Sequence, residues 1–325
     1  MIPIESDFQS ALAPLLRDFV LEKRAVGYLY VTEQYLLRRL DRHLIEHGHG
    51  TATLPKPLLA TWLGRAVHES AKTQSARVRV VRQLARFLRR NGVVVELPAS
   101  SPRALPSTRF VARIFTPDEI GRLLVAVDRM PPDARAPQRH RVMPALFRVL
   151  YGCGLRLGEA LRLRVEDVDL AAGVLTIREA KFRKDRLVPV AASLHAYLQR
   201  YHAEMGERPA EAIFFAAPHG RVYSAHTPYA MFRRMLRTAK IPHGGRGQGP
   251  RIHDLRHTFA VRRLEAWYRE GVDLSSKLPV LSTYLGHESI AGTQRYLQLT
   301  ASLHPDLSSA LEQHYGALIP RGQRA

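Results

Sequence analysis

The first hundred residues alternate apolar and polar positions with the period of an α-helix. Apolar side chains recur three and four positions apart in residues 8–27 and in residues 28–48, and each stretch ends at a glycine. Residues 51–67 carry a proline that is typical of a helix start, and residues 76–92 return to the helical period. This pattern predicts an entirely helical N-terminal part.

The stretch 76–92 separates its two kinds of side chain most clearly. One side of the predicted helix is an apolar stripe, and the other side carries arginines. An arginine face can be ordinary solvated surface or can face DNA, and the pattern alone leaves both interpretations open. The stripe consists of Val78, Val81, Leu84, Phe87 and Leu88, and the arginines are Arg82, Arg86, Arg89 and Arg90.

A change in pattern separates two expected domains. Residues 96–109 are rich in proline and serine and show no periodicity, which is typical of a linker. We therefore expect a helical domain over residues 1–104 and a second domain over residues 105–325. The second domain should open with a helix, because Thr116 suits the N-cap and Glu119 completes a capping box.

Within the second domain the period changes from helical to that of a β-strand. Residues 165–190 alternate apolar and polar positions in period two, with a turn expected at Lys181–Lys184. Helical patterns precede and follow this stretch. The predicted fold class is therefore mainly α, with a small antiparallel β-sheet in the C-terminal domain.

The net charge and the cysteine content limit the classes of function that this chain can have. The chain of 325 residues has a formal net charge of +20 and 46% hydrophobic residues, so it can bury a core and yet should attract a polyanion. Its single cysteine, Cys153, excludes an intrachain disulfide and a cysteine-based metal cluster. The acidic N-terminus does not resemble a signal peptide, and no run of eighteen apolar residues occurs. We therefore expect a cytoplasmic protein.

Four motifs of the second domain carry residues suited to phosphodiester chemistry. They are GLRLGEALRL, the KFRK turn, RIHDLRHTFAV and LGHESIAGTQRYLQL. In chain order they supply an arginine, a lysine, a His-x-x-Arg pair, a histidine and a tyrosine. The candidate catalytic residues are Arg156, Lys181, His253, Arg256, His287 and Tyr296.

Each residue type has a task if a tyrosine opens the phosphodiester. A phenol has a reference pKa of about 10, so it needs a nearby base or cation to become a nucleophile. Arginines supply paired donors for the nonbridging oxygens, and a lysine can protonate a departing sugar oxygen. These cations already provide the electrostatic stabilisation, and the sequence offers no obvious carboxylate cluster for magnesium. We expect neither a metal nor another cofactor.

Taken singly, these residues have simpler interpretations. Arg156 could be a helix-start arginine that pairs with Glu159, and His253 could be an N-terminal helix residue. His287 alone would be a turn residue, and we interpret His257 as structural. A tyrosine at an apolar helical position, such as Tyr296, usually belongs to a core. The chemical interpretation rests on the whole set in one order within a basic chain.

The same motifs resemble the tyrosine recombinase, or phage integrase, family, which includes the Xer recombinases, Cre and lambda integrase. The likeness covers about residues 115–299 through GLRLGEAL, AKFRKDRLVPV, HDLRHTFA and LGHESIAGTQRYL. It implies a helical core-binding domain followed by a catalytic domain. It also implies a site-specific recombinase that cleaves and rejoins double-stranded DNA through a 3′-phosphotyrosyl intermediate, in integration, excision, transposition or resolution.

The resemblance assigns a role to each candidate. Arg156 and Arg256 would clamp the scissile phosphate, and His287 would donate a hydrogen bond to it. His253 would assist proton transfer, and Tyr296 would attack. Lys181 would protonate the 5′ leaving group. We favour it over Lys184 because the family lysine directly precedes the turn, although Phe182 here replaces the family's glycine.

Assembly and the alternatives also follow from the resemblance. Family members act as a homotetramer on two recombining sites, with one dimer per site, and the helix expected in residues 304–319 would dock into a neighbouring copy. One alternative is a type IB topoisomerase, which uses a similar residue set as a monomer. Another is a catalytically silent DNA-binding protein on the same fold. The segment 265–284 is longer than the usual family link.

Overall fold

The computed structural model divides the chain into two compact units, Met1–Phe110 and Val111–Ala325. The domain boundary expected between residues 104 and 105 lies outside the described part of the chain. The structure describes residues 8–67, 69–96, 112–178, 185–245, 249–287 and 289–297.

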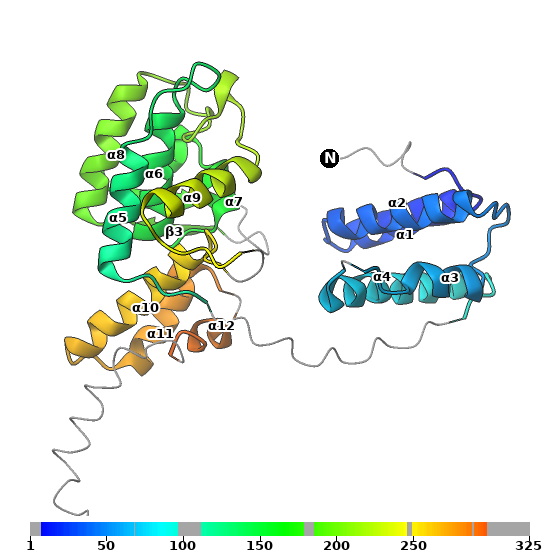
Figure 1. The fold of residues 1–325 in the computed structure, drawn as a ribbon. Helices are drawn as coiled ribbons and strands as arrows, with labels where there is room; N and C mark the ends of the chain where they lie inside the picture. The colour runs from blue at the N-terminus through cyan, green and yellow to red at the C-terminus, as the bar shows by residue number, and fades with distance from the viewer. Residues whose placement is uncertain are drawn as a thin grey trace, which may run out of the picture. The chain divides into compact units, whose positions relative to one another are not determined.

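Among its described residues, the N-terminal unit contains helices joined by loops and no strand, as predicted. In Figure 1, α1 and α2 form one layer and α3 and α4 form a second. Phe19 of α1 lies between these layers, with ring centroids 5.3 Å from Phe87 and 5.7 Å from Tyr30. The helices are α1 (Ala13–Ala25), α2 (Val31–Glu46), α3 (Lys56–Leu63) and α4 (Ala71–Arg90).

Helix α4 packs the predicted stripe inward. Val78, Val81, Leu84, Phe87 and Leu88 are all buried, so the separation of apolar and arginine positions in the sequence corresponds to the core of this unit. The helix begins five positions before the predicted stretch. Its N-cap is Ser70, whose hydroxyl accepts a hydrogen bond from the backbone N–H of Thr73, 3.1 Å away.

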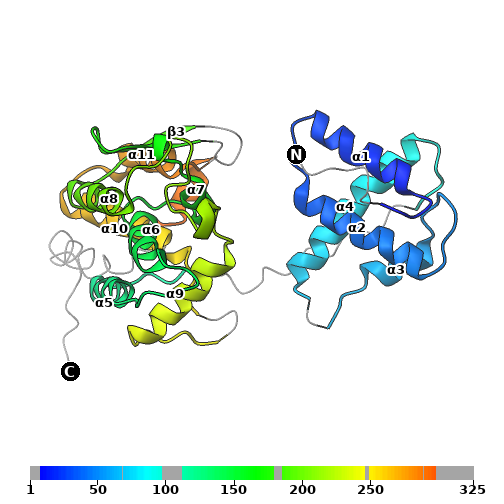
Figure 2. The ribbon, with the colours of Figure 1, turned by 90° about the horizontal axis from the view of Figure 1, so that it is seen from above.

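The C-terminal unit is built around α6, which is apolar on nearly every side. Helices α5, α7, α8 and α10 all contact it, and α5 and α8 lie on either side of it in Figure 2. The helices of this unit are α5 (Pro117–Asp128), α6 (Arg139–Gly152), α7 (Leu157–Arg162), α8 (Ala192–Met205), α9 (His226–Thr238), α10 (Asp254–Arg269), α11 (Leu274–Leu285) and α12 (Ile290–Gln294). Two 3-10 turns, η1 (Val165–Asp167) and η2 (Pro218–Gly220), accompany them.

The predicted antiparallel hairpin is present beside these helices. Its strands are β1 (Val168–Asp169), β2 (Val174–Ile177) and β3 (Arg186–Pro189), in that order across the sheet. Leu175 pairs with Val188, and both are buried, whereas their neighbours along each strand point away from the core. The predicted turn at Lys181–Lys184 lies outside the described residues.

The start of α5 matches the sequence prediction in detail. Thr116 is the N-cap, its hydroxyl accepts from the backbone N–H of Glu119, and the Glu119 carboxylate accepts from the backbone N–H of Thr116. Among the described residues, no helix is both long and apolar enough to cross a membrane.

Candidate active site

Three segments that are far apart in the sequence meet in the C-terminal unit. They are the start of α7, the start of α10 and the segment from the end of α11 through α12. Arg156 is the N-cap of α7 and His253 is the N-cap of α10. Because exposed backbone N–H groups and positive dipole ends gather at helix N-termini, this junction is suited to an anion.

The turn before α7 brings α10 close to it. Gly154 has a φ of +59°, and a Cβ there would approach the Phe259 ring to 2.6 Å, so this position requires glycine. Its carbonyl accepts a hydrogen bond from the Arg256 guanidinium, with Nη1 and oxygen 2.8 Å apart. The glycine turn therefore fixes Arg256 as well as the helix start.

The end of α11 is held by three arginines in succession. The last carbonyls of a helix lack intrahelical partners and carry partial negative charge, so guanidinium groups stabilise them. Each of three consecutive carbonyls accepts from a different arginine. Arg186 donates to Tyr284 at 2.9 Å, Arg256 to Leu285 at 2.7 Å and Arg156 to Gly286 at 2.8 Å.

Glu159 joins two of these arginines. Its side chain is 3% exposed and pairs with Arg156 at 2.7 Å and with Arg186 at 2.8 Å. Burial alone would raise the pKa of this carboxyl, but the hydrogen bonds and charges of Arg186 and Arg156 outweigh it and lower the pKa to about 2. The simpler interpretation of Arg156, as a partner of Glu159, is thus correct, and Arg156 lies in the site as well.

Arg256 is the most buried of the arginines. It is 1% exposed and donates hydrogen bonds to the backbone carbonyls of Gly154 and Leu285, and no carboxylate of the described part forms an ion pair with it. Burial and the nearby charge of Arg156 lower its pKa to about 10, which still leaves it protonated at neutral pH. A buried cation held in this way retains N–H donors for a negatively charged group.

Tyr296 reaches this site from the residues that follow α12. It is 4% exposed, and its hydroxyl oxygen lies 3.2 Å from Nδ1 of His257. Its ring is stacked with that of His287, with centroids 5.9 Å apart, and Nδ1 of His287 lies 2.7 Å from the Thr293 hydroxyl. Burial raises the pKa of Tyr296, and the charge of Arg256 acts in the opposite direction.

The three histidines of the site are held neutral. Burial, followed by the positive charges around them, lowers the pKa of His253 and of His287 to about 4 and that of His257 to about 3. The His253 and His257 rings meet edge to face, 4.7 Å apart. A neutral imidazole has one donor and one acceptor nitrogen, so each ring can pass a hydrogen bond on.

Five of the six candidate residues therefore meet in space. They are Arg156, His253, Arg256, His287 and Tyr296. The sixth, Lys181, and its alternative Lys184 lie outside the described residues. Three further residues of the site, which are His257, Arg186 and Glu159, were not predicted from the sequence. His257 was interpreted as structural, and Glu159 was expected to contact Arg156 alone. The RLVP motif carried Arg186, but only the fold shows what it touches.

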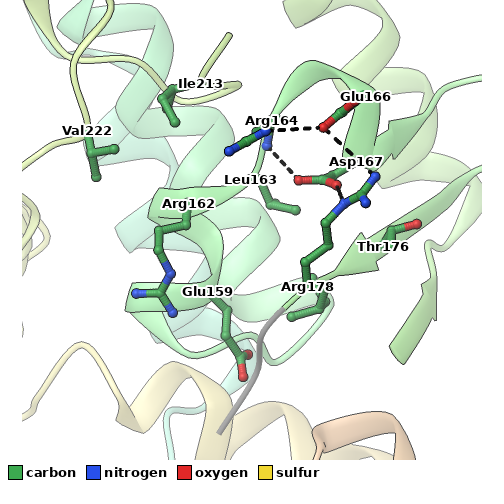
Figure 3. A pocket seen from close by; sticks show the side chains of 11 residues that line it. Glu159, Arg162, Leu163, Arg164, Glu166, Asp167, Thr176, Arg178, Ile213 and Val222 are labelled. Carbon is green, nitrogen blue, oxygen red and sulfur yellow. Dashed lines mark hydrogen bonds and ion pairs between the residues drawn. The ribbon is translucent and has the colours of Figure 1, made fainter. Parts of the chain in front are cut away.

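A pocket of about 390 Å³ adjoins the site without containing its tyrosine (Figure 3). Glu159 and Arg162 line one side of it, and Arg164, Glu166, Asp167 and Arg178 form ion pairs and hydrogen bonds on the other. Tyr296 and Arg256 do not line it. In the part of the chain that the structure describes, no group of three His, Cys, Asp or Glu side chains could hold a metal ion.

Comparison with known proteins identifies the family to which this arrangement belongs. The model of the phage integrase family matches residues 113–302, which include every residue of the site. This chain belongs to the tyrosine recombinase family. Members of the family cleave and rejoin DNA with a tyrosine nucleophile.

Individual tyrosine recombinases are similar over most of the chain. A Sinorhizobium fredii protein named as an integrase/recombinase is 33% identical and covers 94% of this chain and 98% of its own length. Tyrosine recombinase XerC of Chromobacterium violaceum is 30% identical, over 71% of this chain and 70% of its own. This protein is accordingly a site-specific tyrosine recombinase.

Solved structures share the two-domain fold. XerH bound to a palindromic difH substrate has a TM-score of 0.60 at 16% identity, covering 94% of this chain and 91% of that one. The Tn1549 transposon integrase, in complex with a circular intermediate DNA, has a TM-score of 0.62 at 18% identity, covering 87% and 94%. At these identities the likeness concerns the fold alone.

Proposed function

We propose that this recombinase binds double-stranded DNA and that Tyr296 is its nucleophile. The phenol oxygen would attack the scissile phosphorus, form a 3′-phosphotyrosyl bond and release a 5′ hydroxyl. Rejoining would reverse these steps with the 5′ hydroxyl of another strand. Each step exchanges one phosphodiester for another, so the chain needs no external energy source.

Arg156 and Arg256 are the proposed phosphate clamp. Both guanidinium groups are fixed by backbone carbonyls, so they need little reorganisation when the phosphate arrives. Burial is the main cause of the lowered pKa values of Arg256 and of the histidines, and the phosphate charge would offset the second cause, the positive charge around them. The site is therefore built to be completed by an anion.

The remaining candidates are assigned to proton and phosphate contacts. We assign Lys181 to protonation of the 5′ oxygen and His253 to assistance with proton transfer. His287, which follows the anchored end of α11, would donate a hydrogen bond to the phosphate. For assembly, we propose a homotetramer on two sites, with one dimer on each site.

One observation carries this proposal. Arg156 and Arg256, a hundred positions apart, both donate to the carbonyls that immediately precede His287, and Tyr296 lies against the same cluster. A buried tyrosine among helix N-termini and arginines has the surroundings that an attack on phosphorus needs. A core aromatic would need none of these charges.

A suicide-substrate assay tests the proposal. Duplexes from the DNA that flanks the protein's own gene would be nicked at successive positions, so that cleavage releases a short fragment and traps the covalent adduct. We expect wild type and the control Tyr229→Phe, which alters an exposed tyrosine, to form adduct, and Tyr296→Phe to form none. Equal adduct from wild type and Tyr296→Phe would refute the assignment.

The topoisomerase alternative is distinguished by a second substrate. A monomeric type IB enzyme relaxes supercoiled plasmid without a specific site, whereas this recombinase should act on plasmids that carry its own site. We therefore expect relaxation to be faster by at least about tenfold when the site is present, which corresponds to 1.4 kcal/mol of specificity.

A further inference from the structure

The contact between His257 and Tyr296 is not explained by the phosphate clamp. Among the described side chains, the hydroxyl of Tyr296 has two polar neighbours. His257 Nδ1 lies 3.2 Å away, and the positive charge of Arg256 also acts on the hydroxyl. His257 is half-buried, one position after Arg256 in the first turn of α10, and no phosphate role has been assigned to it.

The donors and acceptors around the Tyr296 hydroxyl indicate the direction of its hydrogen bond with His257. A guanidinium has no acceptor, so the phenol proton cannot be donated to Arg256. Among the described hydrogen bonds, Nδ1 of His257, 3.2 Å from the hydroxyl, is the acceptor available to this proton. This places the imidazole proton on Nε2, in the neutral tautomer. The depressed pKa of His257 agrees with this neutral form.

The elements around His257 hold its ring in place. The His253 ring meets it edge to face at 4.7 Å, and α10 is anchored by Arg256 through the carbonyls of Gly154 and Leu285. Tyr296, in contrast, lies beyond α12, which is a helix of one turn. The better-anchored partner of the pair is therefore the histidine, and it can orient the tyrosine.

We propose that His257 is a positioning residue for the nucleophile of this recombinase. Its Nδ1 accepts the O–H of Tyr296, which fixes the rotation of the hydroxyl and leaves a lone pair free for the phosphorus. The inference rests on the proposed role of Tyr296. It adds a residue to the reaction and gives it a task separate from the phosphate contacts and from protonation of the leaving group.

Two substitutions test this role against a purely structural one. Asparagine places an oxygen near the position of Nδ1, whereas leucine fills similar space without an acceptor. At saturating DNA, we expect His257→Leu to slow adduct formation about 100-fold, as misplacement of a reacting group does. His257→Asn should stay within about tenfold of wild type. Both variants should keep the DNA affinity and melting temperature of wild type.

A sulfur substrate separates the nucleophile from the leaving group. When sulfur replaces the bridging 5′ oxygen, the leaving thiolate needs no proton. Lys181→Ala should therefore recover most of its rate on this substrate, while His257→Leu should stay slow. Recovery of His257→Leu to the same degree as Lys181→Ala would overturn the proposal, as would equal losses in His257→Leu and His257→Asn.

A measurement without DNA examines the contact independently of activity. The ¹⁵N chemical shifts of the His257 imidazole distinguish a bare Nδ1 from a protonated one. We expect a bare, hydrogen-bonded Nδ1 in wild type and a shift of that nitrogen in Tyr296→Phe. A protonated Nδ1 in wild type, or no shift in the variant, would overturn the inference even if Tyr296 proves to be the nucleophile. Adduct that forms equally without Tyr296 would refute the proposed function instead.

Discussion

Glu159 is a buried carboxylate that joins two arginines of the candidate site. Replacing it with glutamine would leave Arg156 and Arg186 without a countercharge in a site that is already strongly positive. Breaking a buried pair from one side costs about 3 kcal/mol or more. We expect Glu159→Gln to lower the melting temperature and the rate of adduct formation together, as followed by calorimetry and the suicide substrate.

The matched control for this change is the exposed Glu207. Glu207→Gln removes the same charge from the molecule but no contact from the site, so it should leave both readouts unchanged. If Glu159→Gln has the melting temperature of wild type, the ion pairs of this carboxylate with Arg156 and Arg186 do not stabilise the fold.

The histidines give the stability of the C-terminal unit a defined dependence on pH. Their folded pKa values lie below the unfolded value of about 6.5, so the unfolded chain takes up protons first as the pH falls. Stability should therefore decrease from pH 6.5 toward pH 5. Asp254, whose burial raises its pKa to about 6, opposes this trend. Glu159 does not contribute until the pH falls below 4.5.

His257→Asn isolates one of these contributions. The variant cannot take up this proton, so its loss of stability between pH 6.5 and pH 5 should be smaller than that of wild type by about 1 kcal/mol. Chemical denaturation at the two pH values measures the difference. An identical loss in both proteins would show that His257 titrates normally in the folded state.

The site residues that belong to a sequence motif could be predicted from the sequence. Arg156, Arg256 and Tyr296 stand in recognisable patterns, and each of them reaches the cluster. The contacts of His257 and Arg186 could not be predicted, because they depend on where the end of α11 and the segment after α12 pack. Spacing along one helix places neighbours on a face, but it does not say what will lie opposite.

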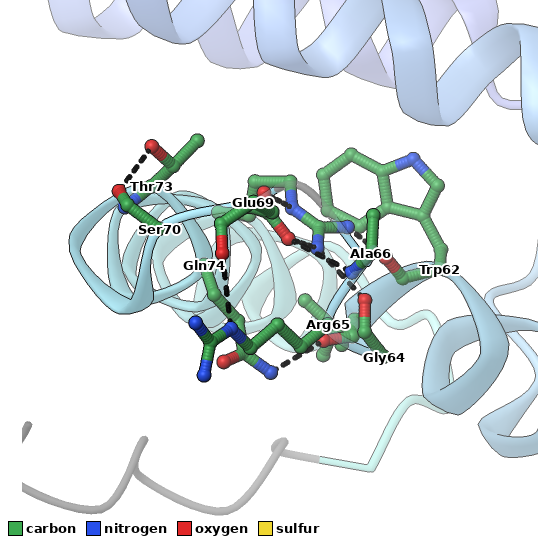
Figure 4. Close-up of polar contacts among 10 residues, drawn as sticks. Trp62, Gly64, Arg65, Ala66, Glu69, Ser70, Thr73 and Gln74 are labelled. Atoms are coloured by element: carbon green, nitrogen blue, oxygen red, sulfur yellow. Dashed lines mark hydrogen bonds and ion pairs between the residues drawn. The ribbon is translucent and has the colours of Figure 1, made fainter. Parts of the chain in front are cut away.

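At the scale of elements, polar contacts around Glu69 and Gly64 link α3 to α4 (Figure 4), and one buried arginine makes several of them. Arg77 of α4 is 4% exposed and pairs with Glu69, with Nε and Oε1 2.8 Å apart. The same guanidinium donates to the carbonyls of Gly64 and Trp62 and stacks on the Trp62 ring at 5.0 Å. A single side chain thus satisfies the end of α3 and fixes the loop that follows it.

Arg77→Leu should destabilise the N-terminal unit selectively. It leaves the Glu69 carboxylate, which is 10% exposed, without its partner, and we expect a loss of about 3 kcal/mol. Trp62 lies in this unit, so its fluorescence during denaturation, in a Trp267→Phe background, reports the change. Arg79→Leu alters an exposed arginine of the same helix and should shift the transition by less than about 0.5 kcal/mol. Equal shifts in the two variants would contradict the role of Arg77.

Elements with strong local signals were predicted best. The capping box of α5 and the alternation of β2 and β3 are encoded in neighbouring residues, and both are present. The start of α4 was placed too late because its first turn, unlike the rest of the helix, carries no apolar stripe. Its helical conformation follows from the Ser70 cap and from the Arg77 contacts, which the periodicity of the sequence does not contain.

At the scale of the whole molecule, the cationic side chains behind the net charge of +20 fall into two groups. Some arginines of the C-terminal unit have partners inside the protein, because they bind helix carbonyls and buried carboxylates. The remainder is available to a polyanion, and binding that releases counterions should weaken steeply as salt increases. The bulk composition predicted the kind of partner, whereas only the fold separates the structural arginines from the others.

Assembly of copies on DNA should depend on the residues that follow Ser302. Residues 304–319 carry a helical pattern, and the family resemblance predicts that this helix docks into a neighbouring copy. A chain that ends at Ser302 keeps all six candidate catalytic residues, so it should still form adduct on a single half-site. It should lose cooperative binding on a full site, because the second copy no longer gains a protein contact. Gel-shift titrations of half and full sites measure both properties on one preparation. Cooperativity that persists after truncation would place the contact between copies elsewhere in the chain.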